Sequence, residues 1–394
     1  MNLLVISDCT HYRSSTGIGN KNPILCKQFD ALFKYFDSVT LLAPLSNEEQ
    51  PGNLISKYNY LSAAKLNFIP TPTVGGGTIA NKIKLMLAIP IWFKLFWNQR
   101  NHDLIYLRFP NNLNIISFLL FRLIDKKMFI TYTGTWRSYS TEPFTYKIQK
   151  SFIKYFLKGP AFVYSTDLFL DKDTRIIGSI SPSFSLLDLL GHETIVHRKI
   201  KKINSVGIET INFACIGSIV EYKNQLLAIE FISYLNTRGL KTKLKIVGSG
   251  SDYLEKLRKY VSKKELESIV EFSGYKPLSE LIHIYEEADF LLHTPKIEGY
   301  GKTPQEGLAF GVIPILSAFP YAMFFTGDSF ERGYVLENSD NLFELGFNYI
   351  IDLVKAPDKM IEKINACYQF AFSLTIESWC ENYIFNLNKN GFLE

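Results

Sequence analysis

The sequence HTPKIEGYGKTPQEG, residues 293–307, lies between a short apolar run and a helical pattern. Gly299 and Gly301 leave backbone amides open to close approach just before a helix start, as a phosphate group would require. The letters TPQE at 303–306 are typical of a helix start, with threonine as the cap and glutamate closing a capping box. Glu298 precedes that cap by five residues, so the capping box does not explain its presence. The sequence therefore predicts that the Glu298 carboxylate faces a binding cleft.

Around this segment, short β-rich runs alternate with longer helical patterns along the whole chain. This alternation is typical of parallel sheets covered by helices. Because 394 residues are too many for one ordinary core, we predict an α/β protein with two Rossmann-like, doubly wound domains facing a central cleft. The domains are expected at 1–190 and 205–372, with the crossing between them in 178–207. The predicted strands are 3–7, 39–43, 66–69, 104–107, 128–132 and 161–164, then 211–216, 243–247, 269–272, 290–293 and 313–316; helices are expected at 224–236, 253–261 and 278–286.

Small or flexible residues follow three neighbouring strands of the second predicted domain. Gly217-Ser218 leads to Lys223, near the N-terminus of the next predicted helix. A lysine there is disfavoured by the helix dipole unless an anion joins it, and a diphosphate would supply that anion. Gly248-Ser249-Gly250 and Gly274-Tyr275 follow the next two strands. Because ligands of such sheets bind at the carboxyl ends of the strands, we expect a binding site there.

Taken in order, these features resemble the retaining GT-B glycosyltransferases of glycosyltransferase family 4. Glu298 and Glu306 are separated by seven residues, like the E-x7-E motif of that family, and the letters GVIP follow at 311–314. The resemblance covers about 211–320. It implies a GT-B fold whose last helix, at about 375–388, packs back on the first domain.

The resemblance implies a role for each matching residue. Glu298 would contact hydroxyls of the transferred sugar and Lys223 would hold the diphosphate, and these two are the predicted catalytic residues. Glu306 would accept hydrogen bonds from the ribose. The other predicted donor-binding residues are Gly17, Gly19, Ser218, Gly274, Tyr275, Gly299, Tyr300, Gly301 and Lys302. The predicted acceptor-side residues are Arg13, Thr135, Trp136 and Arg137.

The chain departs from the family pattern at a few positions. Ser218 stands where the family commonly has arginine, which leaves Lys302 and Arg13 as candidates for the missing phosphate cation. Asn224 stands where glycine is common, and the segment after 128–132 lacks the histidine that the family often shows there. Two alternatives to a transferase therefore stay open: a nucleotide-sugar-binding protein that has lost catalysis, and a GT-B epimerase or phosphorylase.

The activity that the resemblance implies is a retaining, metal-independent sugar transfer of the hexosyltransferase type. The co-substrate would be a UDP- or GDP-linked sugar, with no cofactor. The acceptor would be a glycan or a lipid-linked molecule in the assembly of a bacterial surface polysaccharide such as a capsule or an O-antigen. No convincing metal-ligand set is visible, since the D-x-D run at 171–173 is predicted to be a solvated loop.

Charge is unevenly distributed along the chain. Residues 1–200 contain 23 Lys and Arg against 13 Asp and Glu, whereas the remainder is acidic. The apolar stretches 83–97 and 113–124 are too interrupted or too short to cross a bilayer. Burial against a sheet explains both, but the tryptophans and basic residues of 83–100 also favour contact with an anionic membrane surface. Nucleic acid is not an expected partner.

The cysteines and the N-terminus indicate the compartment. The five cysteines are odd in number and widely scattered, which favours a reduced, cytoplasmic protein. The chain starts with a strand-like run and lacks the pattern of a signal peptide. We therefore expect a cytoplasmic protein at the inner face of the cell membrane.

Gly17 and Gly19, between the first strand and a helical pattern, predict either a phosphate-binding turn or an ordinary tight turn.

Overall fold

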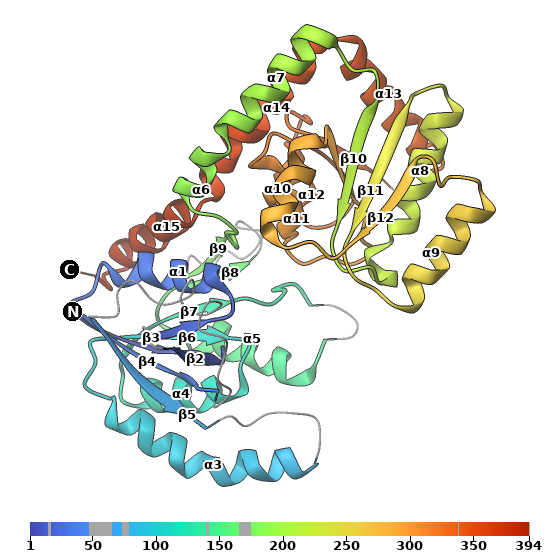
Figure 1. Ribbon diagram of the computed structural model, residues 1–394. Coiled ribbons are helices and arrows are strands. Elements are labelled where there is room, and N and C mark those ends of the chain that lie inside the picture. The colour runs from blue at the N-terminus through green and yellow to red at the C-terminus, as the bar shows by residue number, and fades with distance from the viewer. Residues whose placement is uncertain are drawn as a thin grey trace. The chain divides into compact units, whose positions relative to one another are not determined.

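The computed structural model describes residues 1–14, 17–46, 65–72, 79–138, 142–164, 175–337 and 339–393. The D-x-D run at 171–173 lies outside the described residues. The chain divides into two compact units (Figure 1). Unit 1 comprises Met1–Ser181 and Ile376–Glu394, and unit 2 comprises Pro182–Thr375.

Unit 1 is built on a parallel sheet in the order β5-β4-β1-β6-β7-β8-β9. The six strands predicted in this half are all present, and β9 is an additional strand that the sequence analysis missed. Chain order reverses between β1 and β6, which makes this pair the switch point of the sheet. The strands are β1 (Asn2–Ile6), β4 (Ser38–Pro44), β5 (Leu66–Thr71), β6 (Leu104–Phe109), β7 (Lys127–Tyr132), β8 (Ala161–Tyr164) and β9 (Ile176–Ser179).

Helices cover both faces of this sheet, because alternate strand residues are apolar on each side. Phe29 of α1 and Trp379 of α15 belong to the core on one face. Trp92 of α3, Phe121 of α4 and Ile153 of α5 belong to the core on the other. The C-terminal helix is therefore part of unit 1. The helices are α1 (Pro23–Phe33), α3 (Ile79–Asn98), α4 (Asn112–Leu123), α5 (Phe144–Phe156) and α15 (Ile376–Lys389).

Gly17 and Gly19 do not form the turn that the sequence predicted. They lie in strand β3 (Gly17–Asn20), which pairs antiparallel with β2 (His11–Ser14). Helix α1 begins later, where the Asn22 side chain caps it by accepting from the Ile24 amide at 3.1 Å. The interpretation of these glycines as a strand-to-helix turn is wrong, because their backbone groups are used in a hairpin ladder.

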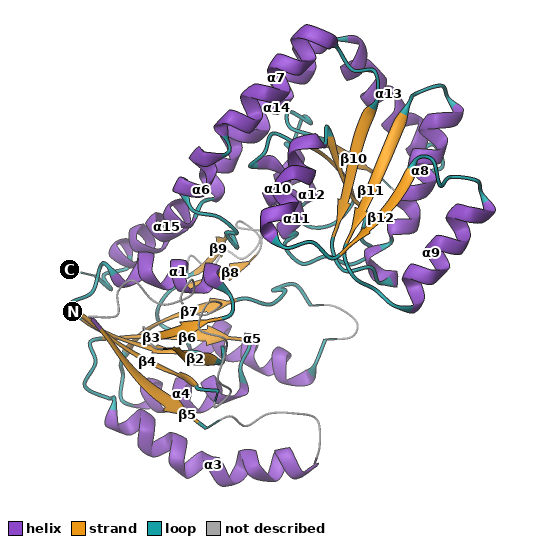
Figure 2. Cartoon of the chain, viewed as in Figure 1, coloured by secondary structure: helices purple, strands orange, loops and turns teal. Residues whose placement is uncertain are grey.

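Unit 2 contains a second parallel sheet in the order β12-β11-β10-β13-β14-β15. The five strands predicted in this half are confirmed, and β15 was missed. The switch point is between β10 and β13, and helices lie on both sides of the sheet (Figure 2). The strands are β10 (Ile211–Ile216), β11 (Thr242–Val247), β12 (Val270–Gly274), β13 (Phe290–His293), β14 (Ile313–Ser317) and β15 (Tyr334–Leu336).

The helices of unit 2 include the three that the sequence predicted. The segment 178–207, expected to cross between domains, also forms two helices, α6 and α7, that were not predicted. The helices are α6 (Leu186–Gly191), α7 (Glu193–Val206), α8 (Gln225–Thr237), α9 (Asp252–Lys263), α10 (Leu278–Glu287), α11 (Lys302–Leu308), α12 (Ala322–Thr326), α13 (Leu342–Lys355) and α14 (Pro357–Ala371).

Helix α3 contains the apolar stretch for which burial and membrane contact were both open. Ala88, Trp92 and Phe96, four residues apart, are buried on one side of the helix. Leu87 and Ile91 are 71% and 53% exposed. Within the described residues, no helix has the length and apolar character needed to cross a bilayer.

The glycines after β11 are required by close packing of two strand-end loops. Gly248 has φ +151°, and a Cβ placed there would lie 1.9 Å from the carbonyl oxygen of Gly217. The same loops are joined by hydrogen bonds from the Gly217 amide to Val247 O and from the Ile219 amide to Ser249 O. The glycine-rich pattern at 248–250 thus has a packing cause.

Replacing Gly248 by alanine is expected to lower the free energy of unfolding by about 2 kcal/mol or more, because the backbone must move to accept the new methyl group. Gly191→Ala is the matched control, since a Cβ there meets nothing within 4 Å. Urea denaturation of both variants measures the effect. Equal stability of Gly248→Ala and wild type would contradict the packing argument.

Candidate active site

Two loops meet at the carboxyl end of the unit 2 sheet, at its switch point. One follows β10 and the other follows β13. The Lys296 amide donates to Tyr222 O at 2.8 Å, and the Thr294 hydroxyl donates to Asn224 O at 3.0 Å. These hydrogen bonds hold the loops together where a ligand of a doubly wound sheet is expected.

Glu298, from the loop after β13, is held by three donors. Lys223 Nζ lies 2.5 Å from Glu298 Oε2, and His293 Nε2 lies 3.0 Å from the same oxygen. The Gly299 amide donates to Oε1 at 3.1 Å. Burial would raise the pKa of the Glu298 carboxyl, but the hydrogen bonds from His293 and Lys223 outweigh it and lower that pKa to about 2. Glu298 is therefore ionised and fixed in orientation.

Lys223 lies immediately before the N-terminus of α8. It ends a short 3-10 turn at Glu221–Lys223, and Asn224, with φ +53°, is the N-cap of the helix. The sequence analysis expected an anion to compensate the cation at this position, and in the structure Glu298 supplies a negative charge. The side chains of Lys223 and Glu298 are 21% and 14% exposed, so the pair remains accessible to a ligand.

His293 is the member of this cluster that the sequence analysis missed. It is the last residue of β13 and is 5% exposed. Burial lowers the pKa of its imidazole, so the neutral ring with a proton on Nε2 donates to Glu298. A histidine that ends an apolar strand five residues before a predicted catalytic glutamate was the available signal.

Glu306 does not close a capping box. Helix α11 begins at Lys302 with Gly301 as its N-cap, and no side chain caps it. The Thr303 hydroxyl donates instead to Ile216 O at 3.4 Å. Glu306 Oε2 accepts from the Tyr285 hydroxyl at 3.1 Å. Burial raises the pKa of the Glu306 carboxyl, and the Tyr285 hydrogen bond opposes that rise.

The other residues of the 298–302 run have different environments. Gly301 has φ +86°, and a Cβ there would lie 3.3 Å from the Phe319 ring, so glycine is required. Tyr300 is buried, with its ring packed edge-on against Tyr321 at 4.6 Å between centroids. Lys302 is exposed at the first turn of α11. Tyr300 thus packs in the core, whereas Lys302 is accessible.

The predicted donor residues of the neighbouring loops also lie at this edge of the sheet. Ser218 is exposed after β10, and its carbonyl accepts from Gln225 Nε2 at 2.9 Å. Gly274 ends β12 with φ +69°. Tyr275 follows it with a side chain that is 75% exposed. The structure therefore brings Ser218, Lys223, Gly274 and Glu298 to the ends of three strands of one sheet.

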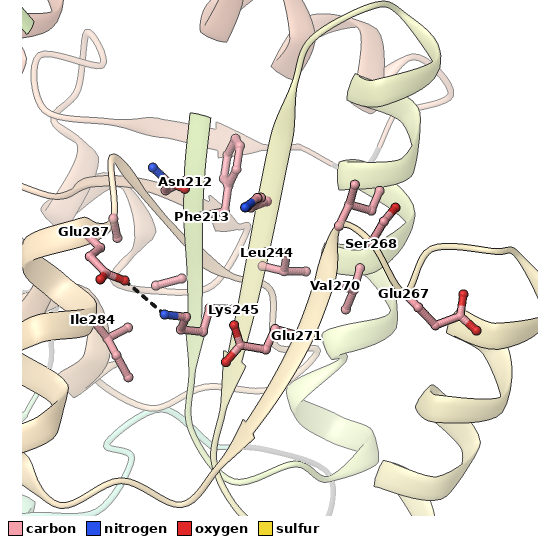
Figure 3. A pocket seen from close by; sticks show the side chains of 14 residues that line it. Asn212, Phe213, Leu244, Lys245, Glu267, Ser268, Val270, Glu271, Ile284 and Glu287 are labelled. Carbon is pink, nitrogen blue, oxygen red and sulfur yellow. Dashed lines mark hydrogen bonds and ion pairs between the residues drawn. The ribbon is translucent and has the colours of Figure 1, made fainter. Parts of the chain in front are cut away.

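A hollow of about 390 Å³ lies at the opposite, amino end of the same sheet (Figure 3). Lys243, Lys245 and Glu271 line it, and Lys245 pairs with Glu287 at 3.0 Å. None of the predicted site residues lines it. The chemistry of Glu298 and Lys223 therefore identifies the carboxyl edge as the candidate site. No group of three potential metal-binding side chains was found in the described parts of the chain.

The predicted acceptor-side residues belong to unit 1. Arg13 is an exposed residue of β2. Thr135, Trp136 and Arg137 lie in the loop after β7, at the carboxyl end of the unit 1 sheet. The Trp136 ring packs edge-on against Tyr132, with 5.4 Å between centroids.

Comparison with solved structures identifies the class of fold. The chain is similar to a glycosyltransferase from Rickettsia africae ESF-5, with 14% identity over 99% of this chain and 98% of that chain, and a TM-score of 0.68. It is similar to Anabaena HepE in complex with UDP and glucose, with 14% identity over 99% and 100% of the two chains and a TM-score of 0.65. A lipopolysaccharide outer core galactosyltransferase, WaaB, gives 12% identity, 99% coverage of both chains and a TM-score of 0.60. The fold is the GT-B glycosyltransferase fold, as predicted.

The family follows from the sequence of unit 2. Residues 197–366 match the family model described as Glycosyl transferases group 1. The chain therefore carries a glycosyltransferase domain of that group, which confirms the family that the E-x7-E spacing indicated. No curated protein matches the chain.

The stability of unit 2 should depend on the charge of Glu298. Because its pKa in the folded protein is about 2, below the ordinary 4.5, the stabilisation is present above pH 4.5 and is lost as pH falls toward 2. Glu298→Gln should therefore cost about 3 kcal/mol at pH 7, with the difference from wild type shrinking below pH 4.5. Denaturant titrations from pH 7 to pH 3 measure this.

Glu344→Gln, on the exposed side of α13, is the control for general acid effects. A Glu298→Gln deficit that stays constant over this pH range would contradict a paired, ionised Glu298.

Proposed function

We propose that this protein is a retaining glycosyltransferase that moves a sugar from a nucleotide-diphosphate donor to a glycan or lipid-linked acceptor. The observation that supports this most strongly is the cluster of Lys223, His293 and Glu298 at the switch point of unit 2. It combines a fixed carboxylate, suited to sugar hydroxyls, with a cation, suited to a diphosphate. Both charges are partly desolvated, so their interactions with a polar ligand are strong.

In the proposed reaction, Glu298 accepts hydrogen bonds from hydroxyls of the transferred sugar. Its orientation is set beforehand by His293 and the Gly299 amide. Lys223 donates to the diphosphate, where negative charge develops as the anomeric C–O bond breaks. The acceptor oxygen forms the new bond on the same face of the sugar, and its proton passes to the leaving phosphate oxygen. A preorganised donor at such a position contributes about 10²–10³ in rate.

The remaining predicted residues would hold the rest of the donor. Glu306 would accept from the ribose hydroxyls, and its bond from Tyr285 fixes the carboxylate for that role. Tyr275, with its exposed ring, would lie against the base. Lys302, at the start of α11, would replace the cation missing at Ser218. HepE, which is similar in fold, binds UDP and glucose, and this supports a UDP-linked sugar as donor.

The acceptor is proposed to belong to bacterial surface polysaccharide assembly at the inner face of the cell membrane. WaaB, of the same fold, is a lipopolysaccharide galactosyltransferase. Helix α3 offers a surface for membrane contact, because Leu87, Ile91 and Phe93 are exposed beside its buried side. Arg100 lies over the Trp97 ring at 4.9 Å, so a basic group and an exposed aromatic group adjoin at the end of that helix.

The transferase proposal predicts that Glu298→Ala lowers turnover by about 10²–10³ while UDP still binds, since the nucleotide is held by other groups. UDP release from a panel of UDP-sugars measures turnover, and calorimetry measures UDP binding. Glu344→Ala is the control for folding and handling. Full turnover in folded Glu298→Ala would remove Glu298 from the reaction.

The same assay distinguishes the alternative of a nucleotide-sugar-binding protein without catalysis, which Ser218 in place of the usual arginine favours. Wild-type protein that binds a UDP-sugar but releases no UDP in the presence of candidate glycan acceptors would support that alternative and contradict the transferase proposal.

Membrane contact through α3 predicts co-sedimentation with anionic vesicles that declines with salt, since each basic residue near such a surface contributes about 1 kcal/mol. Replacing Leu87 and Ile91 together by serine should reduce binding at least about tenfold, because two exposed apolar side chains are lost. Leu278→Ser, which removes an exposed leucine from unit 2, is the matched control. Equal binding of all three proteins would exclude α3 as the contact.

A further inference from the structure

Arg108 lies at the switch point of the unit 1 sheet. It is the fifth residue of β6, directly beside Thr131 of β7, and β6 pairs on its other side with β1. Strand alternation places Arg108 on the same face as Leu104 and Tyr106, the face covered by α1 and α15. Arg108 is the charged residue of a strand whose sequence is LIYLRF, and the proposed donor site in unit 2 does not use it.

The charge of Arg108 is buried without a carboxylate. The residue is 9% exposed. Nη1 donates to the Tyr106 hydroxyl at 3.3 Å, and the guanidinium lies 5.3 Å from the centre of the Phe29 ring. Among the residues that the structure describes, no Asp or Glu lies within ion-pair distance of it. Asp8 interacts with Arg108 at longer range, and burial raises the pKa of Asp8 more than Arg108 lowers it.

The hydroxyl that Arg108 contacts belongs to a chain of hydrogen-bonded hydroxyl groups. The Tyr106 hydroxyl is hydrogen bonded to Thr131 Oγ1 at 2.9 Å, and Thr131 Oγ1 to the Tyr383 hydroxyl of α15 at 2.9 Å. This chain spans two strands and the C-terminal helix, and all three residues are buried. The hydroxyl that Arg108 contacts is therefore itself fixed, which limits the positions open to the guanidinium.

We propose that Arg108 binds an oxyanion, a phosphate or a carboxylate, carried by the acceptor substrate. The guanidinium has five N–H donors in a planar fork, and Tyr106 uses one of them weakly. A buried cation without a directly paired carboxylate is costly, and an oxyanion on the ligand would supply both the charge and the bidentate acceptor. The position at the carboxyl end of β6 is where a ligand of this sheet is expected.

This inference rests on the proposed transferase function only where it assigns the oxyanion to the acceptor substrate. Binding of an anion at Arg108 is measured independently of that function. Titration with inorganic phosphate, followed by ³¹P NMR at constant ionic strength, is the direct probe. Because Lys223 also attracts phosphate, the titration is made in a Lys223→Gln background. Arg108→Met should then weaken phosphate binding at least about tenfold, as expected for the loss of a charge-assisted pair. Arg122→Met, on α4, is the matched control and should leave the affinity unchanged.

Unchanged phosphate affinity in Lys223→Gln/Arg108→Met would overturn the proposal, as would complete loss of phosphate binding in Lys223→Gln alone. If Arg108→Met does not fold, Arg108→Lys replaces it. This variant keeps the charge and loses the planar fork, so phosphate affinity should fall several-fold. Equal phosphate affinity would count against bidentate binding.

A parallel titration with glucuronate identifies which oxyanion is preferred. UDP affinity should be the same in Arg108→Met and wild type. Absence of UDP binding in wild type would contradict the transferase proposal and leave the phosphate result standing.

Discussion

The ion pair between Lys223 and Glu298 links the two loops at the switch point of unit 2, and the candidate site depends on it. Each partner alone would be a partly buried charge at a strand end. Together with His293 they form a compensated cluster in which the carboxylate stays ionised. The pair also has a consequence for binding: Lys223 can reach a diphosphate only by sharing or exchanging its bond to Glu298. The sugar hydroxyls of a complete donor would then compensate Glu298.

The topology of a doubly wound sheet determines where the candidate binding residues lie in both units. In a doubly wound sheet the chain leaves the switch point in opposite directions, which keeps the carboxyl ends of two strands open to a ligand. In unit 2 this position holds Lys223, His293 and Glu298, and in unit 1 it holds Arg108. The hollow lined by Lys243, Lys245 and Glu271 lies at the other, amino end of the unit 2 sheet, and none of the predicted site residues lines it.

Much of the fold was predictable from sequence because buried parallel strands are short apolar runs. Strand β15 was missed because it has only three residues, and β9 was missed because Gly178 and Ser179 limit its apolar run to Ile176 and Ile177. The hairpin of β2 and β3 was missed because Gly17 and Gly19 hide its pattern.

At the site, the spacing of Glu298 and Glu306 predicted the binding motif. The sequence did not show which residues are the hydrogen-bond partners of Glu298. The capping-box prediction was wrong because Gly301, with φ +86°, begins the helix earlier and Thr303 bonds to another strand end. Such choices depend on contacts between segments far apart in the chain.

Calorimetric titration of UDP into Lys223→Gln and Glu298→Gln tests the central claim that the ion pair forms the diphosphate site. UDP lacks the transferred sugar that would compensate Glu298, so the free carboxylate opposes its binding. Lys223→Gln is expected to weaken UDP binding about tenfold or more, whereas Glu298→Gln, which leaves Lys223 uncompensated, should bind UDP more tightly than wild type. Equal UDP affinity in wild type and both variants would show that the nucleotide binds elsewhere and would contradict this account.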